Sequence, residues 1–189
     1  MTERLEGISE EEVDRLRELA HIGASWAAGA FAALAGRTIL TRVPMVHGPE
    51  RFRSRGDWQT GIFCDVHGGL SGLVAVFLPA ATRDVVVSRL CGDVGAPVEA
   101  VASALSEFGN ILASQTVSAI ADTLGERIMP GVPELVMGDA ESVLQARMSP
   151  RHRPPPPLFI ESELFDRQGQ FRALHVVVPE VEKLSEPSE

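Results

Sequence analysis

The sequence predicts an α+β fold with pseudo-two-fold symmetry, in which two long helices cover one face of an antiparallel sheet. An internal repeat supports this first, because residues 14–44 align with residues 103–133 without a gap and eleven of the thirty-one aligned positions are identical. The order of elements supports it as well. In each half a helical apolar repeat precedes a strand-like run and a hairpin. Because both halves need the same sheet to bury their helices, we expect them to form one domain.

The first half opens with a helix that the sequence delimits at both ends. Ser9 with Glu12 three residues later forms a capping box, and Gly36 is a suitable helix stop. The stripe expected to face the core consists of residues at helical spacing, namely Leu16, Leu19, Gly23, Trp26, Ala30 and Leu34. The elements that follow are strand character over 37–46, a hairpin over 57–80 that turns at 67–69, and a short helix over 82–90.

The second half repeats this order. Pro97 opens a second long helix and Gly125 ends it. The remaining elements are strand character over 127–138, a helical stretch over about 139–147, a connector over 151–157, and a closing hairpin over 157–179 that turns at Gln168 and Gly169. We therefore expect a single domain over 1–180, made of repeats over about 8–95 and 97–180, and a charged tail over 181–189.

Composition limits the kinds of partner. The chain of 189 residues has a formal charge of −9, so it lacks the basic face that nucleic acid or an anionic membrane surface requires. No apolar run approaches a membrane span, and the acidic start is unlike a secretory signal, so we expect a cytoplasmic protein. Cys64 and Cys91 lack CxxC spacing and the five histidines lack metal-binding spacing, so we expect buried, inert thiols and no metal site.

A polar stripe runs along the second long helix. At about 100° per residue, Ser103, Glu107 and Asn110 fall on one side of that helix. The opposite side carries apolar residues, namely Val101, Leu105, Phe108 and Leu112. We therefore expect the stripe to point outward.

The stripe recurs in the first half as Asp14, Glu18 and His21. A proline follows each triplet at the same distance, Pro44 in the first half and Pro133 in the second. A solvated helix face is the ordinary interpretation of one such stripe. Common ancestry of the halves would also explain the recurrence without any chemistry.

The pattern Asp or Ser, three residues, Glu, two residues, Asn, twenty-two residues, Pro resembles the signature of the CheC, CheX and FliY phosphatases of bacterial chemotaxis. Ser103, Glu107, Asn110 and Pro133 satisfy all four positions. The duplicated layout is similar to that of a stand-alone CheC. The resemblance implies a CheC-like fold and hydrolysis of the aspartyl phosphate on a CheY-type response regulator. It also implies that the chain needs no cofactor of its own, because the regulator carries the Mg²⁺.

The resemblance makes Glu107 and Asn110 the candidate catalytic pair. A carboxamide can accept a hydrogen bond from the attacking water and donate one to a phosphoryl oxygen without adding negative charge. Glu107 is placed to pair with the regulator's lysine, which fixes the register of docking. We expect Ser103 to be a contact on the helix surface, and Pro133 to shape the strand that follows it.

The first half departs from the pattern because His21 stands where Asn is expected. Neutral imidazole can accept from water at one nitrogen, whereas protonated imidazole offers only donors. Three interpretations follow. Asp14, Glu18 and His21 form a degenerate site that only docks a regulator, they form an altered active site, or His21 is a tolerated surface residue.

Two other functions compete with the phosphatase. One is a non-catalytic adaptor that binds response regulators or the receptor deamidase CheD, a partner that the resemblance suggests. The other is a structural descendant of the flagellar switch family, which assembles without turnover. Because a duplicated chain already contains the symmetry that a single-site relative gains by pairing, we expect a monomer.

Overall fold

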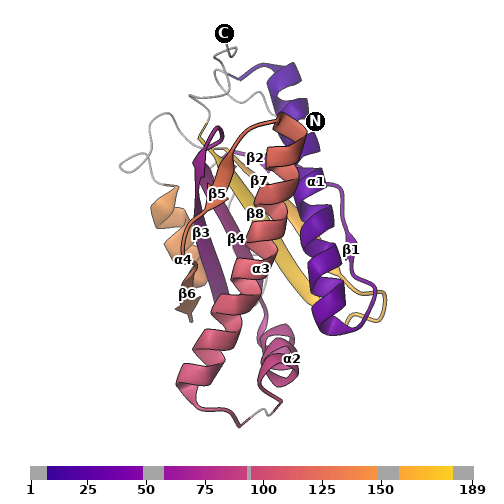
Figure 1. Cartoon of the computed structure of the whole chain (residues 1–189), viewed down its shortest axis with the longest axis vertical. Helices are drawn as coiled ribbons and strands as arrows, with labels where there is room; N and C mark the ends of the chain where they lie inside the picture. Colours follow the sequence, from indigo (N-terminus) through magenta and orange to yellow (C-terminus); the bar gives the residue numbers. More distant parts are fainter. Residues whose placement is uncertain (1–7, 49–57, 93–94, 149–157, 181–189) are drawn as a thin grey trace.

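The computed structural model describes residues 8–48, 58–92, 95–148 and 158–180 (Figure 1). The predicted connector over 151–157 and the predicted tail over 181–189 lie outside these residues. The described elements, in chain order, are α1 (Glu10–Ala35), β1 (Leu40–Thr41), β2 (Met45–His47), β3 (Thr60–Gly68), β4 (Gly72–Leu78), α2 (Ala80–Cys91), α3 (Val98–Leu124), β5 (Ile128–Pro130), β6 (Glu134–Met137), α4 (Ala140–Arg147), β7 (Phe159–Phe165) and β8 (Arg172–Pro179).

The strands form one antiparallel sheet whose order is symmetric about its centre. The order is β1-β7-β8-β4-β3-β5, with β2 also paired to β7 and β6 also paired to β3. The hairpin strands β4 and β8, one from each half, meet in the middle. Each half pairs its two short strands with the hairpin of the other half, because β1 and β2 lie against β7 and β5 and β6 lie against β3. The predicted duplicated antiparallel sheet is confirmed.

The two long helices lie side by side across one face of the sheet (Figure 1). They are antiparallel, because Phe31 of α1 packs edge-on against Phe108 of α3, whereas the earlier Gly23 lies against the later Thr116. The approach is close at Gly23, where an added Cβ would lie 2.8 Å from Thr116 Cγ2. The helix pair and its place on one face agree with the prediction.

The caps that the sequence predicts delimit both long helices. The Glu12 N–H donates to Ser9 Oγ at 3.2 Å and the Ser9 N–H donates to Glu12 Oε2 at 2.8 Å, so the capping box is complete. Gly36 and Gly125 end α1 and α3 in the left-handed conformation, with φ of 64° and 67°. These glycines are equivalent in the internal alignment, so both helices turn toward their edge strands in the same way.

The core lies on both faces of the sheet. Alternate residues of β3 and β4 point to opposite faces, so Ile62 and Val76 pack with α1 and α3, whereas Phe63 and Phe77 pack with α4. The central strand β4 is buried along its whole length. The short helix α4 therefore covers the face opposite the long helices.

Two predictions from the sequence are wrong. The first hairpin does not turn at 67–69, because His67 and Gly68 still pair with Met129 and Ile128 of β5, and the chain turns between Gly68 and Gly72 instead. Trp26 does not belong to the buried stripe, because its side chain is 58% exposed. Gly23 is on the side of α1 that packs against Thr116 of α3, whereas Trp26, three residues later, lies on the outer surface.

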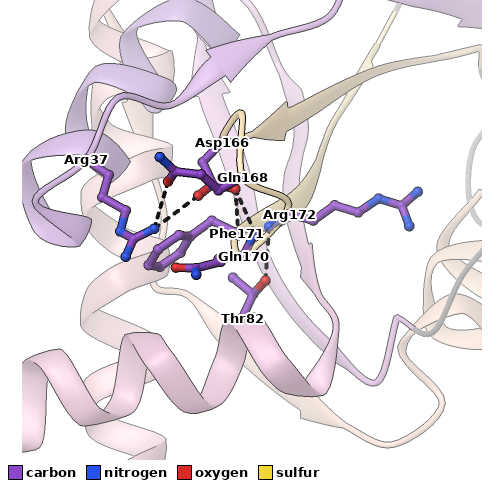
Figure 2. A network of polar contacts seen from close by, with 7 residues as sticks. All are labelled: Arg37, Thr82, Asp166, Gln168, Gln170, Phe171 and Arg172. Atoms are coloured by element: carbon purple, nitrogen blue, oxygen red, sulfur yellow. Dashed lines mark hydrogen bonds and ion pairs between the residues drawn. The ribbon is translucent and has the colours of Figure 1, made fainter.

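The turn between β7 and β8 is tied to the ends of α1 and α2 (Figure 2). Asp166 accepts from the Gln170 and Phe171 N–H groups at 2.7 and 3.1 Å and from Arg37 at 3.4 Å. Burial alone would raise the pKa of Asp166, but these three donors hold it below its usual value. The Arg172 N–H donates to Thr82 Oγ1 of α2 at 3.0 Å. This network fixes the end of the helix pair where α1 finishes.

At Gly109 the helix α3 lies close against the sheet. An added Cβ would lie 2.2 Å from Ile62 Cγ2, on a buried β-branched side chain of β3. We expect Gly109→Ala to lower the free energy of unfolding by about 1–2 kcal/mol, because overpacking of about 2–3 kcal/mol exceeds the gain of about 1 kcal/mol in helix propensity. Urea unfolding measures this change.

Gly29→Ala is the matched control on α1. A Cβ at Gly29 would meet nothing within 4 Å, so only the helix propensity changes. We expect this variant to be more stable than the wild type by up to about 1 kcal/mol. Equal stabilisation by both substitutions would show that α3 does not lie against Ile62 as described.

Candidate functional site

The predicted polar stripe lies on the outer side of α3. Ser103 and Glu107 are exposed and Asn110 is half-buried, while Leu105 and Phe108 between them are fully buried. The spacing of four and then three residues places the three polar side chains on adjacent turns of one helix. The outward orientation expected from the sequence is confirmed for Ser103 and Glu107, and Asn110 is less exposed than these two.

Buried contacts on either side hold this turn of α3 in place. Phe108 packs edge-on against Phe31 with ring centroids 5.2 Å apart, and Gly109 rests on Ile62. In the described part of the chain, neither Glu107 nor Asn110 uses its side chain in a hydrogen bond or an ion pair. The backbone is therefore fixed while both functional groups stay available to a partner, which is the arrangement that a preorganised contact needs.

Pro133 lies in the break between the short strands β5 and β6, and it is half-buried. The preceding Gly131 donates its N–H to the Asp65 carbonyl at 2.7 Å and accepts from Cys64 Sγ at 3.2 Å, which secures the break against β3. Pro44 occupies the equivalent break between β1 and β2 and is buried. Both prolines thus divide an edge strand in two, which also discourages pairing of these edges with another chain.

The first-half triplet lies on α1. Asp14, Glu18 and His21 are all exposed, so the structure brings them together on one helix side as it does for the second triplet. Asp14 forms an ion pair with Arg17, whereas the aligned position of Arg17 in the second half is Ser106. The two triplets do not meet, because α1 and α3 are antiparallel and each triplet lies toward the beginning of its own helix.

Charge distinguishes the two ends of the helix pair. The His21 end combines the start of α1 with the end of α3, and its acidic residues are Glu10, Glu11, Glu12, Asp14, Glu18, Asp122 and Glu126. Its basic residues are Arg15, Arg17 and Arg127. Among the described residues, the Asn110 end carries Glu99 and Glu107 on α3, the Arg37–Asp166 pair after α1, and Arg83, Asp84 and Arg89 on α2. An anionic group therefore meets less repulsion at the Asn110 end.

Neither cysteine belongs to a cluster of metal-binding side chains in the described part of the chain. Among residues 8–48, 58–92, 95–148 and 158–180, no cluster of three or more His, Cys, Asp or Glu side chains could hold a metal ion. Cys64 is buried, and the loss of solvent together with the charge of Asp65 raises the pKa of its thiol. Cys91 is a half-buried free thiol. Within the same described ranges, no helix has both the length and the apolar character to cross a membrane.

The segment that carries the α3 triplet also matches a known protein family. Residues 101–137 match the model of the CheC-like family, and this segment contains Ser103, Glu107, Asn110 and Pro133. Over 182 residues the chain is 29% identical to a protein of Bacillus subtilis (strain 168) named CheY-P phosphatase CheC, with 87% of this chain and 85% of that protein covered.

Solved structures show the same architecture. FliY of Thermotoga maritima superposes with a TM-score of 0.70 at 19% identity, covering 94% of this chain and 96% of that one. A chain of the CheX–CheY–BeF3–Mg²⁺ complex of Borrelia burgdorferi superposes with a TM-score of 0.62 at 15% identity, covering 85% and 96%. The fold is that of the CheC, CheX and FliY proteins. The chain is similar to CheC-like proteins, and the resemblance stated from its motif is confirmed.

Trp26 is the surface residue that the sequence reasoning missed. The helical spacing placed it in the apolar stripe, yet it is among the most exposed large side chains of the helix pair. A signal was available in the internal alignment, where Trp26 corresponds to Gln115. A position that holds a polar residue in one half of a duplicated protein is a poor candidate for the core in the other.

Proposed function

We propose that this protein accelerates hydrolysis of the aspartyl phosphate on a CheY-type response regulator in the cytoplasm. The observation that carries the proposal is the Glu107–Asn110 pair, held on a rigid turn of α3 inside the segment that matches the CheC-like family. Within the described ranges, neither side chain has a hydrogen-bond or ion-pair partner. The similarity to a protein named CheY-P phosphatase over most of the chain supports the same activity.

Asn110 positions the attacking water. Its carboxamide oxygen accepts from the water and its NH₂ group donates to a phosphoryl oxygen, so it aligns the nucleophile without adding a charge beside the anion. The water oxygen forms a bond to phosphorus, the bond from phosphorus to the aspartate oxygen breaks, and aspartate and inorganic phosphate result. The regulator's own Mg²⁺ and lysine neutralise the developing charge, so the chain contributes geometry rather than a metal.

Glu107 orients the docked regulator. It is exposed one turn before Asn110, where it can pair with the regulator's lysine while the carboxamide enters the phosphorylation site. An exposed pair of this kind contributes more to register and encounter rate than to affinity. Ser103, a further turn away, contacts the outer surface of the regulator, and Pro133 shapes the neighbouring edge strand.

The first half supports a second candidate function. His21 replaces the asparagine, Asp14 is engaged by Arg17, and the surrounding end of the helix pair is acidic. These features favour a face that binds a partner without turnover, as in an adaptor for response regulators or for CheD. The chain acts as a monomer in both functions, because its two halves already supply both helix faces.

The test is the decay rate of a phosphorylated CheY-type regulator from the same organism, with and without this protein. We expect the protein to accelerate decay in catalytic amounts and to prefer the activated regulator over the unphosphorylated one. Calorimetry with the beryllofluoride-activated and the free regulator measures that preference. An unchanged decay rate together with equal binding of both forms would refute the phosphatase and favour the adaptor.

A further inference from the structure

We propose that Met137 of β6 contacts the regulator beside Asn110, so that the binding surface crosses from α3 onto the edge of the sheet. This inference rests on the proposed function and extends it to a residue outside the motif. It names the partner as a phosphorylated receiver domain and gives that partner an apolar contact in addition to Glu107 and Asn110.

Asn110 lies on the side of α3 that faces away from α1. Phe108 packs against Phe31 of α1, and Gly109, the next residue, rests on Ile62 of the sheet. Successive residues of a helix are turned by about 100°, so Phe108, Gly109 and Asn110 point in turn to α1, to the sheet and away from α1. The strand β6 contacts α3 and lies on this side of it, opposite α1 (Figure 1).

Leu135 and Met137 are the residues of β6 on the helix side of the sheet. Leu135 is opposite Ile62, and directly opposite residues of an antiparallel pair point to the same face. Leu135 accordingly packs with the core beneath the long helices. Met137 is opposite Thr60, two residues further along the same face. Two residues of a strand span about 7 Å, so Met137 flanks α3 about one turn from Asn110.

This flank of the site is apolar and uncharged. Met137 is 52% exposed, and the nearest polar residues on this side of α3, Ser103 and Ser106, are short and neutral. The one charged residue of β6, Glu134, lies on the opposite face, where it pairs with Arg147 of α4. A methionine side chain is flexible and polarizable, and methionine is enriched in protein interfaces. The flank therefore offers an adaptable apolar contact next to the carboxamide.

The two halves differ at this position. Continuing the 89-residue offset of the internal alignment by four residues pairs Leu135 with Val46. Val46 packs beside α1 as Leu135 packs beside α3, so the two strands are equivalent. The same offset pairs Met137 with Gly48, which offers no side chain to a partner. The apolar contact thus accompanies the intact motif, and the motif that carries His21 lacks it.

Charge favours a phosphorylated receiver over a second copy of this chain as the partner at this surface. A receiver brings an anionic phosphoryl group to Asn110 and a lysine to Glu107, and the helix side of β6 adds no negative charge beside them. A second copy would bring another net charge of −9 against this face. Like charges of that size oppose self-association.

Methyl NMR on the intact chain tests where the regulator contacts it. The chain has five methionines, and isotope labelling of their methyl groups gives each a separate signal. We expect the Met137 signal, which is the one that Met137→Leu removes, to shift when beryllofluoride-activated regulator and Mg²⁺ are added. Met129 of β5 is the control, because it is 53% exposed on the same edge strand region, while its neighbour Ile128 packs beneath α3. Met129 therefore points to the other face of the sheet, and its signal should not shift.

Met137→Gln should raise the Kd for the activated regulator roughly tenfold, because a polar side chain loses the apolar contact. The KM for the phosphorylated regulator should rise with it, while kcat changes by less than about twofold, because Met137 lies away from the reacting atoms. Met137→Leu stays apolar and should keep the Kd within about threefold of the wild type. Met129→Gln should bind like the wild type. Calorimetry measures the Kd, and urea unfolding of both glutamine variants should match the wild type.

The outcomes separate this inference from the proposed function. If the wild type accelerates decay and Met137→Gln keeps the same Kd and KM, the role of Met137 is wrong and the phosphatase stands. If the wild type neither binds the activated regulator nor accelerates decay, both are wrong. If Met129→Gln weakens binding as much as Met137→Gln, the regulator does not follow the helix side of the sheet and the inference is wrong. If Met137→Gln changes only the sedimentation of the protein alone, the face pairs with a second copy and the inference is overturned.

Discussion

Replacing Asn110 by alanine is expected to lower the stimulated decay of a phosphorylated regulator by about 100-fold or more, which brings it close to the decay of the regulator alone. The substitution removes the carboxamide, whose oxygen accepts from the water while its NH₂ group donates to a phosphoryl oxygen. Because alanine favours helix and Asn110 makes no side-chain hydrogen bond in the described chain, the fold should be unaffected. Time courses of phosphoregulator decay measure the effect.

His21→Ala is the matched control, because it removes the equivalent side chain of the first half. We expect it to leave the stimulated rate nearly unchanged, since turnover depends on one centre. Asn110→Ala should still bind the beryllofluoride-activated regulator, because Glu107 remains in place. If His21→Ala lowered the rate as much as Asn110→Ala, the first half would hold a working centre and the single-centre mechanism would be wrong.

Acidification is expected to destabilise the protein by about 3 kcal/mol through one buried histidine, His175 of β8. Burial lowers the pKa of His175 from 6.5 to about 4. Its Nε2 lies 3.0 Å from Thr116 Oγ1, whose hydroxyl donates to the Leu112 carbonyl at 2.9 Å, so Nε2–H donates to the hydroxyl. Nδ1 is buried without a hydrogen-bond partner among the described residues, and a proton there would be unsolvated.

The direction of the pH effect on stability follows from the pH at which the folded and the unfolded chain each bind the proton. Between pH 6.5 and about 4 the unfolded chain protonates this histidine and the folded chain does not, so stability falls as the pH is lowered through this window. About 2 kcal/mol of the loss should be present by pH 5. Asp166 contributes at lower pH, because its pKa lies below an ordinary value of 3.8.

Urea unfolding at pH 7.5, 6 and 5 measures this loss, with His175→Leu as the comparison. The variant places an apolar side chain at this buried position and has no proton to bind, so between pH 7.5 and 5 it should lose about 2 kcal/mol less stability than the wild type. Identical pH profiles for the two proteins would show that His175 is already protonated in the folded state or is reached by water.

Local signals in the sequence predict most of the helical layer. The capping box at Ser9, the glycine stops and the 89-residue offset between Glu18 and Glu107 each depend on residues near one another in the chain or on identity between halves. The outward triplets follow from helical periodicity alone. These features needed no knowledge of which strand pairs with which.

Long-range packing explains what the sequence did not predict. Nothing in the repeat indicates that β1 and β2 pair with β7 rather than with their own hairpin, because both arrangements satisfy the same apolar pattern. The exposure of Trp26 depends on which side of α1 packs against α3 and the sheet, which spacing along one helix does not report. The sequence also did not predict the burial of His175, because that burial depends on α1, α3 and β8 meeting at Thr116.

Because the halves exchange edge strands, the two repeats must fold together. The outward faces of α1 and α3 can nevertheless differ from each other. A fragment containing only one half would leave its hairpin without β1 and β2, or without β5 and β6, so two fragments divided between α2 and α3 should fold only when mixed. Selection for the shared sheet preserves the strands and the buried side of each helix in both halves. Selection for the sheet does not act on the outer side of α1. The first repeat can therefore change its outward triplet and still be required for the folding of the second repeat.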